Sequence, residues 1–218
     1  MRSDSMPDEL ARLPLALSSS RSRWDHLAEV ISQVTNPTYI ALPTFLVVAL
    51  HTAPNVETGL LWWLVTTAGI SLAPLLHIAQ GVRVGRYHDH HLSVRQERLL
   101  PIVVGLGGAG AALALLLLWH ASRPYLATIA AVVVGAALAL AITHGARWKI
   151  SLHVAGNAGA VTVLVIVFGW LALLFTPLVV LVGWARWHLR AHTLAQVVAA
   201  MLIAVGVTLA IFRLFGVR

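Results

Sequence analysis

The chain of 218 residues contains no cysteine. Disulfides, thiol catalysis and zinc sites built on cysteine are therefore excluded. Charged residues are also scarce, at 11% of the chain, whereas a soluble domain carries about 25%. After residue 60 the only acidic residues are Asp89 and Glu97. Two carboxylates are too few to build a pair of magnesium sites from two aspartate-rich loops.

Lysine is almost absent as well, because Lys149 is the single one, and arginine supplies nearly all of the positive charge. The formal net charge is +7. The basic residues are spread over several loops and do not form one stripe, so we expect no nucleic-acid partner. Anionic membrane lipids or a phosphorylated substrate are the simpler partners.

What the chain has in abundance is apolar sequence: 59% of its residues are hydrophobic and the mean hydropathy is +0.83. The apolar residues form long unbroken runs and do not alternate, which favours membrane helices over a barrel. A spanning helix needs about 20 such residues. We therefore expect an all-α, polytopic membrane helix bundle with about six transmembrane helices, at roughly 33–52, 58–80, 100–120, 124–144, 153–175 and 193–213, and one short helix at 177–187.

The N-terminal region differs in composition from the rest. Residues 1–30 mix acidic and basic side chains with one short apolar patch, unlike a cleaved signal peptide. We interpret residues 1–30 as a mobile or amphipathic tail and residues 31–218 as a single transmembrane helical domain.

Following the expected helices through a membrane places three polar loops, 81–99, 145–153 and 186–192, on the same face as the tail. This face then holds twelve of the fifteen Lys and Arg residues. The positive-inside rule assigns such a face to the cytoplasm. We therefore predict a multi-pass protein of the cell (inner) membrane with its polar loops and N-terminus on the cytoplasmic side.

The third of these loops has the most specific spacing in the chain, since Arg186 is followed after five residues by His192. The second loop carries Lys149, Ser151 and His153, and the first adds arginines and a run of histidines. Charge at the edge of a membrane segment is costly unless it is solvated or functional. These loops bring guanidinium, ammonium and imidazole groups to one membrane face.

This set of groups suits phosphate chemistry. Guanidinium matches phosphate oxygens in a bidentate manner, and low dielectric strengthens the contact. Two histidines suit phosphoryl transfer through a covalent intermediate, because one can attack phosphorus while the other protonates the leaving oxygen. Cationic side chains can neutralise the developing charge, so no metal and no cofactor are required.

The residues resemble the type-2 phosphatidic acid phosphatase superfamily, which shares its fold with vanadium haloperoxidases. That family has three motifs: Lys-x6-Arg-Pro, Pro-Ser-Gly-His and Ser-Arg-x5-His-x3-Asp. In the third motif Arg186 matches the arginine, His192 matches the histidine that attacks phosphorus, and Ala185 replaces the serine. Gln196 stands at the aspartate position, on the same helical face as His192.

The other two motifs match in part. Ser151 and His153 keep the serine and the acid histidine of the second motif, without its proline and glycine. In the first motif Arg98 takes the place of the arginine, with His91 where the lysine should be and Leu99 in place of the proline. We expect Lys149 to supply the ammonium that the first loop lacks.

The resemblance implies a membrane phosphatase, a phosphoric monoester hydrolase. Its substrate would be a polyprenyl or glycerolipid phosphate or diphosphate, cleaved through a phosphohistidine intermediate without a cofactor. A glutamine at the aspartate position offers a hydrogen-bond acceptor but no negative charge, which implies reduced basicity at His192 or slower turnover. The implied catalytic residues are His192, His153 and Gln196, and the implied phosphate-binding residues are Arg98, Lys149, Ser151, Arg186 and His91.

Three alternatives remain open at this point. One is a prenyl-transferring membrane enzyme, although the scarcity of carboxylates counts against it. Another is a protein without catalysis, either an inactive relative or a bundle whose histidines hold haem. The third is a metal at the run of His88 to His91, where neighbouring residues would converge on an ion only in a bent loop.

Overall fold

The computed structural model describes residues 22–86, 99–146 and 148–217. Within these ranges every regular element is a helix, which confirms the expected all-α class. The helices are α1 (Arg23–Val34), α2 (Pro37–Thr52), α3 (Val56–Thr67), α4 (Ala73–Arg83), α5 (Leu99–Leu118), α6 (Arg123–Gly145), α7 (Leu152–Phe168), α8 (Thr176–His188) and α9 (Leu194–Leu214), with a π-helical turn at Ala68–Leu72 and a 3-10 helix at Trp170–Phe175.

Several of these helices are long and apolar enough to cross a membrane. In the described ranges four segments qualify: Val56–Arg83, Arg123–Gly145, Trp170–His188 and Leu194–Leu214. A fifth qualifies if α1 and α2, which meet at 43°, form one bent span. The expected apolar runs at 100–120 and 153–175 also fold as helices, and in these regions the stretches Val103–Leu118 and Leu152–Phe168 are shorter apolar helices.

The region from 153 to 187 is divided differently from our expectation. The helix expected to end at 175 stops at Phe168, because Gly169 has a φ of 83°, a left-handed conformation that glycine adopts readily. The 3-10 helix and α8 then run on as the 19-residue segment Trp170–His188. The short helix expected at 177–187 is therefore the larger part of a segment long enough to span.

A second break separates α1 from α2. The side chain of Asn36 accepts a hydrogen bond from the backbone N–H of Thr38 at 3.0 Å, and Pro37 begins α2. Both residues are favoured at the start of a helix. The expected tail of residues 1–30 thus ends inside the ordered helix α1, while residues 1–21 lie outside the described part.

Small residues allow close packing between helices. A Cβ atom on Gly69, in the π-helical turn, would collide with the carbonyl oxygen of Gly108 in α5, and the reverse substitution would collide as well. On α7, a Cβ on Gly156 would come within 3.1 Å of Pro37. The glycines at 105–110 and 156–159 therefore include positions where helices approach closely, as expected for membrane bundles.

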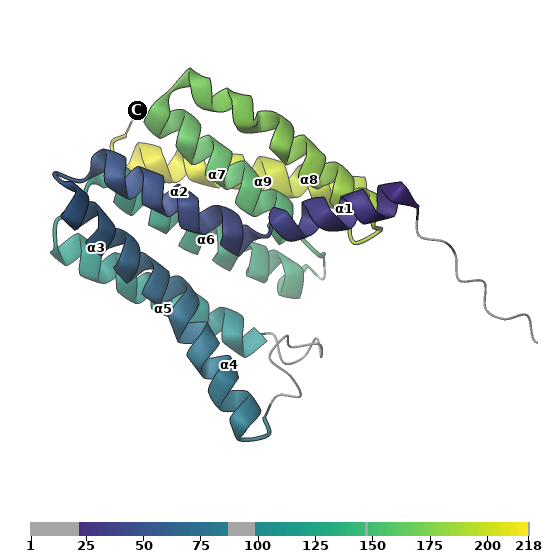
Figure 1. Cartoon of the computed structure of the whole chain (residues 1–218), viewed down its shortest axis with the longest axis horizontal. Helices are drawn as coiled ribbons and strands as arrows, with labels where there is room; N and C mark the ends of the chain where they lie inside the picture. Colours follow the sequence, from purple (N-terminus) through teal and green to yellow (C-terminus); the bar gives the residue numbers. More distant parts are fainter. Residues whose placement is uncertain (1–21, 87–98, 147, 218) are drawn as a thin grey trace, which may run out of the picture.

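The connections gather at two opposite ends of the bundle (Figure 1). At one end Ser122 Oγ donates to Thr52 Oγ1 at 2.7 Å, and the rings of His51 and Phe168 lie 4.7 Å apart. The other end carries α1, the start of α7 and the connection from α8 to α9.

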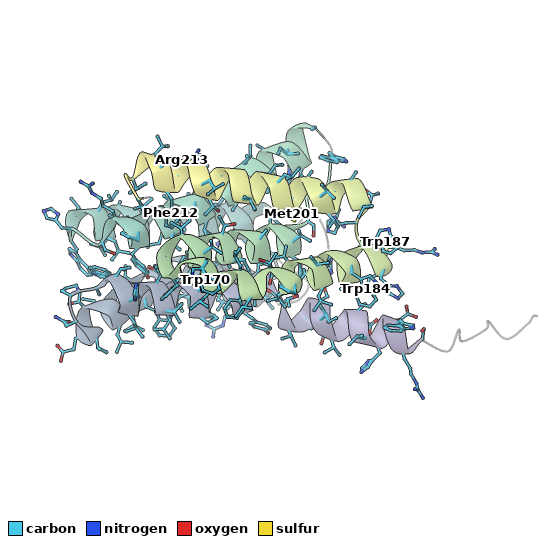
Figure 2. The ribbon with its side chains drawn as sticks, turned by 90° about the horizontal axis from the view of Figure 1, so that it is seen from above. Trp170, Trp184, Trp187, Met201, Phe212 and Arg213 are labelled. Carbon is cyan, nitrogen blue, oxygen red and sulfur yellow. The ribbon has the colours of Figure 1, made fainter. Side chains whose placement is uncertain are left out.

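Two of the expected polar loops, 145–153 and 186–192, are therefore close in space. Figure 2 shows Trp184 and Trp187 at this end and Arg213 toward the opposite one. Most of the 81–99 loop lies outside the described residues.

Candidate anion site at one end of the bundle

The candidate site is built where the connection between α6 and α7 meets the connection between α8 and α9. Lys149 Nζ donates to the carbonyl oxygen of Ala191 at 3.4 Å. His192 lies beside this contact and is 8% exposed, whereas Lys149 is exposed. The loops that carry the second and third motif matches thus meet at this contact.

The local backbone explains how His192 is placed. The helix α8 ends in a tight turn in which Arg190 adopts a φ of 52°, unusual for a residue with a side chain. The N–H groups of Ala191 and His192 both point back to the carbonyl oxygen of Arg186, at 3.1 and 3.2 Å. Thr193 then caps α9, so His192 is fixed between two helix ends.

Two further site residues lie at the start of α7. Ser151 is at the N-cap position, fully buried, and its hydroxyl makes no capping bond. His153 follows as the second residue of the helix and is half-buried. Its carbonyl oxygen accepts a hydrogen bond from Asn157 Nδ2 at 2.8 Å, and the same nitrogen also donates to the carbonyl oxygen of Thr35 at 3.0 Å.

Arg186 occupies the last turn of α8 and points toward α1. Its Nη1 donates to Ser32 Oγ at 2.7 Å. Its Nε is buried and has no partner. The guanidinium group is therefore held on one side and still has donors to give on the other.

Unpartnered polar atoms are concentrated at this end. The described part of the chain has five buried side-chain polar atoms without a hydrogen-bond partner, and four of them lie here. Buried polar groups are nearly always hydrogen-bonded, and leaving one unpaired costs about 1–3 kcal/mol. A group of such atoms marks a place where ordered water or another polar ligand would supply the missing hydrogen bonds. The four are Ser151 Oγ, Asn157 Oδ1, Arg186 Nε and His192 Nδ1.

Electrostatics link three of the residues. Burial, followed by the nearby charges of Arg186 and His192, lowers the pKa of His153 to about 4. Burial, followed by the cations of Lys149 and Arg186, also lowers the pKa of His192 below its usual value. His153, Arg186 and His192 are thus close enough to repel each other's positive charge. Such a site favours an anion, which would relieve that repulsion.

Gln196 makes a different hydrogen bond from the one that the sequence suggests. Its side-chain oxygen accepts from the backbone N–H of Thr193 at 3.0 Å and so completes the cap of α9. Nδ1 of His192 has no partner, although the Gln196 side chain is close enough to oppose the lowering of the His192 pKa. Gln196 therefore completes the cap of α9 and also lies beside the His192 ring.

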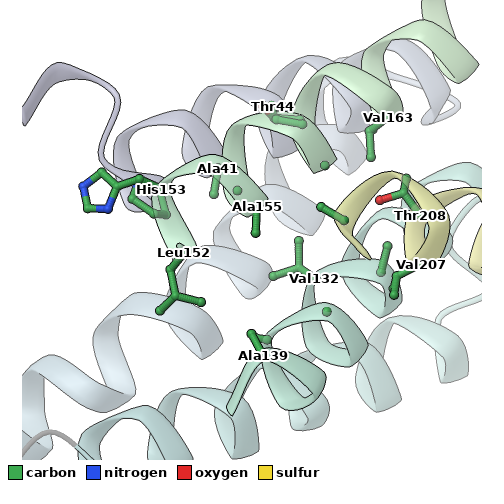
Figure 3. Close-up of a pocket in the computed structure, with 18 of the residues that line it drawn as sticks. Ala41, Thr44, Val132, Ala139, Leu152, His153, Ala155, Val163, Val207 and Thr208 are labelled. Carbon is green, nitrogen blue, oxygen red and sulfur yellow. The ribbon is translucent and has the colours of Figure 1, made fainter. Parts of the chain in front are cut away.

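The two histidines face different hollows. His192 lines an open pocket of about 510 Å³ together with Lys149, Arg190 and Gln196. His153 lies at the edge of a second pocket of about 490 Å³ inside the bundle, lined mainly by aliphatic residues of α2, α6, α7 and α9. Figure 3 shows the His153 ring turned away from this aliphatic lining. Neither of these two pockets is lined by both histidines, although the two rings are close enough for their charges to interact.

Some predicted residues fall outside the described part. Arg98 and His91, assigned to the first motif match, lie there, as does the histidine run at 88–91. Elsewhere, no group of three or more metal-ligating side chains is found in the described ranges.

Two residues of the site escaped sequence reasoning. Ser32 binds Arg186, and Asn157 joins α7 to the α1–α2 break. Asn157 is one helical turn after His153, a spacing visible in the sequence, and a fully buried amide in an apolar helix is the signal that was available. Ser32 gives no such signal, because its role depends on how α1 packs against α8.

Comparison with known proteins adds no relative: no family model, curated protein or solved structure matches this chain.

Proposed function

We propose that this protein is an integral membrane phosphatase that hydrolyses a lipid phosphate or diphosphate through a phosphohistidine intermediate. One observation carries the proposal. Three residues assigned to phosphate chemistry by their spacing, Ser151, Arg186 and His192, each have a buried polar atom without a partner. A bound phosphoryl group would provide acceptors for the guanidinium and hydroxyl donors and would compensate the positive charge around the two histidines.

The proposed reaction has two steps. A ring nitrogen of His192 attacks phosphorus, a P–N bond forms, and the P–O bond to the lipid alcohol breaks while His153 gives that oxygen a proton. In the second step His153 takes a proton from water, the oxygen attacks phosphorus, and the P–N bond breaks to release phosphate and restore His192. Arg186, Ser151 and Lys149 stabilise the charge on the phosphoryl oxygens.

The surroundings of the site support a lipid as the substrate. The pocket beside His153 is lined mainly by aliphatic side chains, and its volume is within the usual range for a ligand site of roughly 300–1,000 Å³. The helices around it are apolar enough to lie in a bilayer. A hydrocarbon chain in this pocket would bring its phosphate end toward His153.

The same proposal includes the finer topology. Six transmembrane helices and the returning segment Trp170–His188, with α1 lying outside them, would place the N-terminus and the site on the cytoplasmic side of the inner membrane. Arg98 and His91 would join the site from the loop between α4 and α5. Reporter fusions at the N-terminus and at the α2–α3 turn test this arrangement, and the two should report opposite sides of the membrane.

The decisive experiment replaces His192 by Ala in purified protein and measures phosphate release from prenyl and glycerolipid phosphates in mixed micelles. We expect turnover to fall by at least about a thousandfold. The matched control is His144→Ala, because His144 is exposed at the end of α6 and makes none of the contacts described above. Turnover by His192→Ala equal to that of His144→Ala would remove the proposal. Activity that persists in a metal chelator would argue against the prenyl-transfer alternative.

A further inference from the structure

We infer that Ser32 of α1 is a positioning residue of the anion site, acting through Arg186, so that α1 is part of the site. The inference rests on the proposed function for its ligand, a phosphoryl group. Its physical basis is the 2.7 Å hydrogen bond from Arg186 Nη1 to Ser32 Oγ. Ser32 is buried, with 7% of its surface exposed, so water competes little for this bond.

The bond to Ser32 decides how the guanidinium is presented. A guanidinium is planar and carries five donors in a fixed geometry, so anchoring one nitrogen restricts the orientation of the others. With Nη1 engaged by Ser32, the buried Nε has no partner and is available to an acceptor. Without the hydroxyl, the side chain would lose this anchor and sample other rotamers before the anion arrives.

Ser32 also contacts the acid histidine through its backbone. Its carbonyl group is close enough to His153 to oppose the lowering of the pKa of that ring. One residue thus touches Arg186 with its side-chain oxygen and His153 with its main-chain oxygen. The position of α1 therefore affects both groups that the proposed reaction assigns to the phosphoryl centre.

Other contacts hold α1 in place against α8. His188 Nε2 lies 2.9 Å from Asp25 Oδ1, and the ring of Trp24 meets that of Trp184 edge-on with centroids 6.2 Å apart. At the other end of α1, the carbonyl oxygen of Thr35 accepts from Asn157. Because α1 is fixed at both ends, removing the Ser32 hydroxyl is expected to disturb Arg186 without displacing the helix.

The test uses inorganic phosphate, measured by calorimetry on the full chain in detergent, with lipid-phosphate turnover followed on the same samples. We expect Ser32→Ala to weaken phosphate binding about tenfold, as for the loss of a hydrogen bond to a charged group. Ser32→Thr keeps the hydroxyl and should restore binding to within about twofold. Gln33→Ala, an exposed neighbour on the same helix, is the control and should bind as the parent does.

A second variant pair separates positioning from a general effect on folding. If Ser32 acts through Arg186, Ser32→Ala should cause no further loss in an Arg186→Ala background. The inference is overturned if Ser32→Ala binds phosphate like the parent, if Ser32→Thr fails to rescue, if the two losses simply add, or if the parent binds no phosphate. A parent that binds phosphate but releases none from lipids would instead refute the proposed function and leave the role of Ser32 standing.

Discussion

The low pKa of His153 leads to a quantitative expectation for the dependence of catalysis on pH. As the group that protonates the leaving alcohol, His153 must carry a proton, yet its pKa of about 4 leaves it mostly neutral in the free enzyme at neutral pH. Above pH 4 the protonated fraction falls tenfold per unit, to roughly one part in a thousand at pH 7. Since kcat/KM reports the free enzyme, it should rise about tenfold for each unit of acidification from pH 7 to pH 5.

The nucleophile does not cancel this trend. Burial and the charges of Lys149 and Arg186 lower the pKa of His192 too, so its ring stays neutral and nucleophilic below the usual range for histidine. A bound phosphoryl group carries negative charge and raises the pKa of both imidazoles. The optimum of kcat should therefore lie at a higher pH than the optimum of kcat/KM.

The assay measures initial rates of phosphate release between pH 4 and 8 with a lipid monophosphate in mixed micelles. The substrate itself titrates, with a second pKa of about 6 for a phosphate monoester. His153→Asn supplies the control, because it retains the substrate titration and lacks the imidazole. A value of kcat/KM that is flat or increases from pH 5 to pH 7, or a slope that survives unchanged in His153→Asn, would refute the reasoning.

Three further predictions follow from the packing and the charges. Gly135 lines the apolar pocket and has open space beside it, so the leucine side chain in Gly135→Leu would occupy the pocket. We expect this variant to lower the turnover of long-chain substrates and to spare that of short-chain substrates. Gly107 also has open space beside it but lies outside the pocket, so Gly107→Leu should change neither turnover. Gly108→Ala should lower the unfolding temperature in detergent, because the collision costs about 1–3 kcal/mol, more than the roughly 1 kcal/mol gained in helix propensity. Lys149→Ala removes a nearby cation and should raise the pKa of His192. The acid limb of kcat/KM should then move to higher pH, because the nucleophile needs a higher pH to be neutral. An acid limb that does not move would mean that Lys149 does not act on His192.

The sequence predicts the helices well, because apolar run length is a strong signal. The runs at 124–144 and 193–213 coincide with α6 and α9 within a residue or two. The division of 153–187 was predicted wrongly at Gly169. Whether a glycine in an apolar run stays helical or turns left-handed depends on the packing around it, which composition does not record.

The candidate site is predictable in part. The spacing of Arg186 and His192, together with the order of the loops, predicts that the second and third loops come together, and Lys149 and Ala191 of these loops are in contact. The hydrogen-bond partner of Gln196 was not predictable, since its side-chain oxygen could accept either from the His192 ring or from the backbone N–H of Thr193. The contribution of α1 was hidden for a related reason: it depends on a helix–helix contact between distant parts of the chain.

The position of α1 also constrains biogenesis. Ser32 and Arg186 are 154 residues apart in the chain, and Asp25 and His188 are 163 apart. The helix α1 therefore meets these partners only after α8 has been synthesised. A nascent chain that stops after α7 would carry an exposed amphipathic segment, and supplying α8 and α9 as a separate fragment should allow that segment to dock. The assembly of this end of the molecule thus depends on the synthesis of α8 and not on α1 alone.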